Sequence, residues 1–164
     1  MPSTAHPTTE AAAETDARRA ALAALAAADL AALDAAWAAL APQPAWRWLR
    51  RPETGLLMVR GRAGGSGAPF NLGEVPVTRC AVALDDGPAG FGWVMGRVPR
   101  KAWLVAVFDA LWQRPERRAE VEAAVIAPAR VARADADRTR RAETAATRVD
   151  FFTLVRGEDE ETAP

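Results

Sequence analysis

The sequence contains very little histidine and cysteine, the residue types that most often carry catalysis or metal binding. Among its 164 residues there is one histidine, His6, and one cysteine, Cys80. His6 lies near the N-terminus, so the body of the chain has no histidine to act as a general base or a metal ligand. A single cysteine forms no intrachain disulfide and fits a reducing compartment. These absences argue against a Ser-His-Asp hydrolase, a histidine metal site and a cysteine metal cluster.

The sequence also lacks a long hydrophobic segment and a candidate pair of catalytic acids. It has no run of about eighteen apolar residues and no signal-peptide pattern, so we expect a cytoplasmic protein. Its acidic candidates, Asp85, Asp86, Glu53 and Glu74, stand beside glycines and prolines and are first of all turn residues. We therefore expect no catalytic residue and no metal ligand in this chain.

The formal net charge is zero, but the charge is unevenly distributed. Residues 1–17 and 158–164 hold seven acidic residues and no basic one, which leaves 14 acids against all 21 basic residues in between. Twenty of those 21 are arginines, whose planar guanidinium suits phosphate. A basic body with acidic ends favours an anionic ligand or partner surface, although a solvated protein face can show the same excess.

Residues 58–82 contain two alternating, β-rich segments around a glycine-rich centre, which predicts a β-hairpin with a long loop. Arg60 and Arg62 are two residues apart and so share one face of the first strand, and Arg79 lies on the second strand. The loop matches neither a Walker A motif nor a dinucleotide fingerprint, and a glycine-rich connection needs no ligand. Nevertheless, free backbone N–H groups beside arginines can hold an anion. The candidate phosphate-binding residues are Arg60, Arg62, Gly64, Gly65, Ser66, Gly67 and Arg79.

The remaining pattern predicts helices on both sides of an antiparallel meander. Helical periodicity runs from Arg18 to Leu40, as one helix or as two with a break near Ala28, where Asp29 can cap the second. Strands are predicted near 45–50, 55–62, 75–84 and 90–96, the last two joined by a tight turn at 85–88. Further helices are predicted from Pro99, with an apolar stripe, from Pro115 to about 124, and over 129–146.

These elements predict one α+β domain, an antiparallel β-sheet meander with a glycine-rich hairpin, packed against N-terminal and C-terminal helices. The expected boundaries are a disordered tail over 1–17, the domain over 18–157 and an acidic disordered tail over 158–164.

Four segments carry a resemblance to a known family. They are Arg51–Glu74, Val77–Val82, Gly92–Arg97 and Thr147–Gly157, in this order. On these residues the chain resembles the PhnG family, a subunit of the bacterial carbon-phosphorus lyase machinery for phosphonate breakdown, from about residue 18 to 158. One block departs from the family pattern. After Gly96-Arg97 many members carry an Asp and then a His-Ala-Glu, whereas this chain has Val98-Pro-Arg-Lys-Ala-Trp103, so the resemblance implies no role for that histidine here.

The resemblance implies a non-catalytic or accessory subunit. PhnG-like proteins act with PhnH, PhnI and PhnL in the step in which a phosphonate displaces adenine from ATP, giving a ribose 1-phosphonate 5-triphosphate. The nucleosidase-type chemistry is ascribed to PhnI. The implied partners are therefore PhnI-like, PhnH-like, PhnJ-like and PhnL-like subunits. ATP and a phosphonate are the implied substrates of the complex, and no cofactor is implied for this chain.

Two C-terminal segments indicate where such partners would bind. The helix over 129–146 is nearly polar all round, which is typical of a helix lying against another chain. Val149–Val155 alternates apolar residues on both faces and indicates a buried strand, in this sheet or a partner's. The candidate interface residues are Arg133, Arg140, Phe151 and Phe152.

Two other classes of protein remain possible on the sequence alone. A stand-alone basic nucleic-acid-binding module would use the arginine excess, but the aromatic residues mostly fall on amphipathic core stripes and not between basic residues. A lone enzyme is the weakest reading, because no nucleophile with a base is visible in the sequence.

Overall fold

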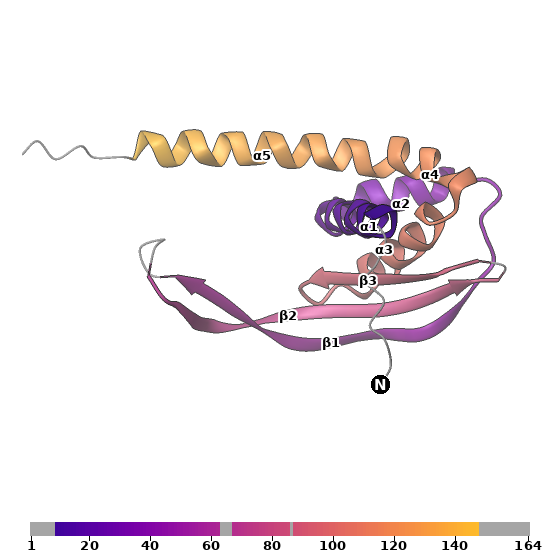
Figure 1. The fold of residues 1–164 in the computed structure, drawn as a ribbon, viewed down its shortest axis with the longest axis horizontal. Coiled ribbons are helices and arrows are strands. Elements are labelled where there is room, and N and C mark those ends of the chain that lie inside the picture. The colour runs from indigo at the N-terminus through magenta and orange to yellow at the C-terminus, as the bar shows by residue number, and fades with distance from the viewer. Residues whose placement is uncertain (1–8, 63–66, 86, 148–164) are drawn as a thin grey trace, which may run out of the picture.

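The computed structural model describes residues 9–62, 67–85 and 87–147. The described residues form an antiparallel sheet in the order β1-β2-β3, with the helices lying on one side of it (Figure 1). This architecture confirms the predicted α+β class and the packing of a meander against N-terminal and C-terminal helices. The elements in chain order are α1 (Thr9–Ala27), α2 (Leu30–Ala39), β1 (Trp46–Arg62), β2 (Pro69–Leu84), β3 (Ala89–Met95), α3 (Pro99–Trp112), α4 (Pro115–Val121), the π-helical turn η1 (Glu122–Ile126) and α5 (Ala127–Ala146).

The described sheet has three strands, where four were predicted. Segments 45–50 and 55–62 belong to one strand, β1, because register shifts between Trp48 and Glu53 let it bend without breaking. β1 pairs with β2 from Trp46 to Arg62, whereas β3 pairs only with residues Val77 to Ala83 of β2. Residues 63–66 of the glycine-rich connection lie outside the described residues.

Helix α3 forms the centre of the core. All of its residues from Ala102 to Trp112 are buried, and not only those of the predicted apolar stripe. Two glycines of β3 explain how the helix comes so close to the sheet. A Cβ atom at Gly90 would lie 1.9 Å from the carbonyl oxygen of Ala106, and one at Gly92 would lie 1.9 Å from that of Ala102. Backbone therefore packs directly on backbone here, which only glycine permits.

Helix α1 begins at Thr9, so residues 9–17 are helical and the prediction of disorder there is wrong. The segment is rich in alanine, a strong helix former, and Glu14 pairs with Arg118 of α4. The predicted break near Ala28 is present, and the Asp29 carboxylate accepts the N–H of Ala31 to cap α2. No single helix among the described residues is long and apolar enough to cross a membrane; α1 and α2 pass that test only as a pair, which is bent by 109°.

The helix predicted over 129–146 is not separate from the one before it. Helical backbone continues from α4 through η1 into α5, because the π turn shifts the hydrogen bonds so that the Ala127 N–H donates to the Glu122 carbonyl. Pro128 has no backbone N–H, and the shifted hydrogen bonds of the π turn let the helix continue without that donor. None of the residues of α5 is buried, and the helix runs out beyond the others (Figure 1). The predicted strand Val149–Val155, with Phe151 and Phe152, and the acidic tail lie outside the described residues.

Candidate functional site

The most prominent surface feature is a ribbon formed by the far halves of β1 and β2. Pairing of β2 with β3 ends at Val77, opposite Met95, while β1 and β2 remain paired as far as Arg62 and Pro69. Residues 56–62 and 69–76 therefore form a two-stranded extension, which we call the arm. In Figure 1 the arm and α5 extend toward the same end of the molecule.

The arm exposes large apolar side chains on both of its faces. Leu56, Leu57, Met58, Phe70 and Leu72 have exposed fractions between 46% and 64%. Because successive strand residues point to opposite faces, the consecutive residues 56, 57 and 58 cover both sides. No residue of the arm is fully buried. A two-stranded ribbon is marginally stable in water on its own, and exposed apolar surface of this kind marks a binding site.

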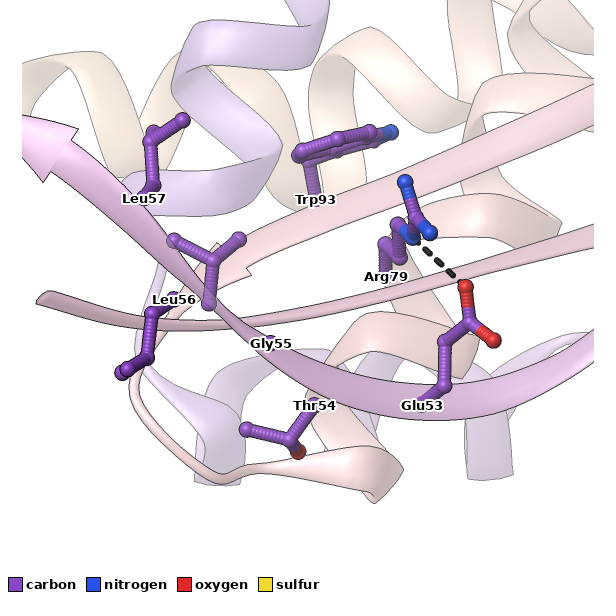
Figure 2. A pocket seen from close by; sticks show the side chains of 8 residues that line it. Glu53, Thr54, Gly55, Leu56, Leu57, Arg79 and Trp93 are labelled. Atoms are coloured by element: carbon purple, nitrogen blue, oxygen red, sulfur yellow. Dashed lines mark hydrogen bonds and ion pairs between the residues drawn. The ribbon is translucent and has the colours of Figure 1, made fainter.

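A hollow of about 410 Å³ lies at the base of the arm (Figure 2). Arg79 donates through Nε to Oε1 of Glu53 at 2.6 Å, and its guanidinium carbon lies 5.5 Å from the ring centroid of Trp93. The hydrogen bond from Arg79 lowers the pKa of Glu53, and the charge of Arg50 acts in the same direction. Figure 2 shows Leu57 standing near Trp93 over the strands. Arg79 is thus paired with a carboxylate, and Leu56, Leu57 and Trp93 contribute apolar surface to the hollow.

The structure does not bring the predicted phosphate-binding arginines together. Arg79 is paired with Glu53, whereas Arg60 lies seven positions further along β1, which is about 23 Å at roughly 3.3 Å per strand residue. The structure therefore separates Arg79 from Arg60 and Arg62 along the sheet.

At the tip of the arm the structure retains part of the predicted set. Arg62 donates through Nη1 to the carbonyl oxygen of Gly67 at 3.0 Å. Gly64, Gly65 and Ser66 lie outside the described residues. That Arg60 and Arg62 hold an anion stays a prediction.

The predicted interface residues of α5 share one face of the helix. Arg133 and Arg140 are exposed, and both pair with Asp137, at 4.0 Å and 3.0 Å. Their spacing of three and four residues from Asp137 places all three side chains on the same helical stripe.

Sequence reasoning missed a cluster of tryptophans. Trp103 lies 5.1 Å from Trp37 and 5.2 Å from Trp46 between ring centroids, and Trp48 packs on Trp46 at 4.8 Å. They line a second hollow of about 460 Å³, where Arg100 stacks on Trp103 at 4.4 Å. These residues come from α2, β1 and α3, so their grouping depends on tertiary packing and leaves no local signal. Half-buried tryptophans with an arginine are typical of the centre of a protein interface.

Comparisons with known proteins cover almost the whole of this structure. The family model for the phosphonate metabolism protein PhnG matches residues 16–157. A curated relative, the alpha-D-ribose 1-methylphosphonate 5-triphosphate synthase subunit PhnG of Rhizobium meliloti (strain 1021), is 51% identical over 143 residues, which are 87% of this chain and 90% of the relative. The matched range contains the arm, both hollows and α5. The chain therefore belongs to the PhnG family.

Proposed function

We propose that the chain is a non-catalytic, accessory subunit of a cytoplasmic carbon-phosphorus lyase complex. In this proposal it acts with PhnH-like, PhnI-like, PhnJ-like and PhnL-like subunits in the transfer of the ribose triphosphate moiety of ATP to a phosphonate, with release of adenine. Support comes from its family and from the name of its relative, a subunit of the synthase of alpha-D-ribose 1-methylphosphonate 5-triphosphate. In this proposal the catalytic groups belong to a partner subunit, and this chain supplies contact surfaces.

The observation that carries the proposal is the arm. Its leucines, Met58 and Phe70 expose apolar side chains on both faces, while the described body of the chain has a core of its own. A surface of this kind is expected to be covered in the working protein, since burying one such side chain contributes about 1.5–3 kcal/mol. The partner surface that fits the arm is an apolar groove that encloses the ribbon from two sides.

The experiment is copurification with a tagged PhnI-like subunit. The arm variant carries Leu56→Ser and Leu57→Ser together, and we expect it to bind the partner about 100-fold more weakly, from two lost side-chain burials. Leu49→Ser is the matched control, because Leu49 is on the same strand and is 49% exposed against 50% for Leu57, but it lies outside the arm. Equal binding by the arm variant and the wild-type chain would contradict the proposal.

A further inference from the structure

A third hollow, larger than the other two, lies between α5 and the corner formed by α1 and α2. It has a volume of about 920 Å³ and is lined by the α1–α2 corner, the start of α3, and the end of η1 with α5. We call it the α5 groove. Much of its wall is alanine, from Ala27 and Ala28 at the corner to Ala132 and Ala136 on α5. Small side chains leave the volume open, and that volume falls within the roughly 300–1,000 Å³ typical of small-molecule sites.

Three cationic side chains line this groove. Lys101, the single lysine of the chain, comes from the first turn of α3, and Arg133 and Arg140 come from α5. Lys101 is half-buried, and within the described residues it belongs to no ion pair. Burial lowers its pKa, partly offset by the charge of Asp29. The groove thus partly shields an ammonium group that belongs to no ion pair among the described residues.

Two carboxylates, Asp29 and Asp137, also line the groove. Asp29 caps α2 by accepting the N–H of Ala31 at 3.4 Å. Asp137 is shared by Arg133 and Arg140. A guanidinium offers five N–H donors, so one carboxylate shared between two arginines leaves most of those donors available. Each of the other two hollows described above contains one arginine, Arg79 or Arg100.

We propose that the α5 groove binds a phosphate-rich polyanion of the triphosphate class, with Lys101, Arg133 and Arg140 as its ligands. The planar guanidinium of arginine binds two phosphate oxygens at once, and an ammonium group adds a compact positive charge. The groove supplies the concave, partly desolvated setting in which such contacts are strong. The assignment rests on the proposed function, which brings a ribose triphosphate into the same complex, and it names the part of this chain that would hold it.

The test measures binding of inorganic triphosphate and of ATP to the full chain by titration calorimetry at two salt concentrations. Lys101→Met keeps the length of the side chain and removes its charge, and we expect it to weaken triphosphate binding roughly tenfold. Arg140→Gln should weaken binding several-fold, and Lys101→Arg should retain most of it. Arg138→Gln is the matched control on α5, because Arg138 pairs with Asp135 and does not line the groove.

Three outcomes would overturn the assignment. The first is triphosphate binding equal in Lys101→Met and wild type. The second is binding lost in an Arg60→Gln, Arg62→Gln double variant but kept in Lys101→Met, which would place the anion at the tip of the arm. The third is no triphosphate binding together with loss of copurification in Lys101→Met, which would make the groove a partner contact. Copurification with the PhnI-like subunit is measured on the same variants, so that failure of this assignment is distinguished from failure of the accessory-subunit proposal.

Discussion

Arg18 and Asp109 form a two-pronged ion pair that fastens α1 to α3. Arg18 donates through Nε to Oδ1 at 2.9 Å and through Nη2 to Oδ2 at 2.7 Å, and Asp109 is 1% exposed. Oδ2 also accepts the backbone N–H of Phe91 in β3 at 2.9 Å. The hydrogen bond to Asp109 raises the pKa of Arg18, so Arg18 stays charged at any working pH. One buried carboxylate therefore connects two helices and a strand.

Asp109→Ala is expected to destabilise the fold strongly, because it leaves the guanidinium of Arg18 and the N–H of Phe91 without their partner. Removing one member of a buried pair costs about 3–5 kcal/mol. The side chain of Arg18 is 30% exposed, so water screens part of the loss, and we expect about 2–3 kcal/mol in urea unfolding. Asp16→Ala is the control, because its pair with Arg19 is exposed and should contribute less than about 0.5 kcal/mol. Similar losses in both variants would contradict this account.

Gly90→Ala and Gly92→Ala are each expected to disrupt the contact between β3 and α3. The added methyl group would meet a backbone carbonyl oxygen 1.9 Å away, and a helix backbone cannot rotate aside as a side chain can. We expect a loss of about 3 kcal/mol or more in the free energy of unfolding. Gly55→Ala is the matched control in β1, where nothing lies within 4 Å of the added atom. A loss in Gly55→Ala as large as in Gly90→Ala would refute the close-packing explanation.

Local signals predicted the starts of two helices, α2 and α3. Asp29 marked the beginning of α2 and Pro99 that of α3, because capping and the proline ring act within one turn. Features that depend on distant packing were not predictable. Gly90 and Gly92 allow α3 to pack closely on β3. Their spacing in the sequence is compatible with a strand but does not indicate which element packs against that strand. The helix over 129–146 was predicted as a separate helix, and the π turn that joins it to α4 has no sequence signature of its own.

The candidate sites were also only partly predictable from the sequence. The arginines of the hairpin were correctly placed on two strands, but strand register decides which side chains meet, and the pairing of Arg79 with Glu53 could not be read from the sequence. Lys101 lines the same hollow as Arg133 and Arg140 because helical backbone continues through η1 without a break, which places α5 along that hollow.

Cys80 is expected to resist thiol reagents in the folded chain. Its side chain is buried, and burial raises the pKa of the thiol to about 11 from an ordinary value of 9.0. Below pH 9 the thiol is neutral in both folded and unfolded chains, so its ionisation has no effect on stability there. Above pH 9 the unfolded chain loses the proton first, so the contribution of Cys80 to stability falls as pH rises. The difference in urea midpoint between wild type and Cys80→Ala should therefore vary with pH only above pH 9. Fast labelling of the native chain at pH 8 would count against burial.

The arm is expected to make the isolated chain self-associate or bind a hydrophobic dye, because Leu56 and Leu57 expose apolar surface. Sedimentation at increasing concentration should show association that the double variant Leu56→Ser, Leu57→Ser suppresses. The same variant should unfold within about 0.5 kcal/mol of the wild type, since neither side chain is part of the core. Adding the PhnI-like subunit should abolish dye binding by the wild type. A wild-type chain that stays monomeric at all concentrations and binds no dye would show that the arm needs no cover, and would remove the observation on which the accessory-subunit proposal depends.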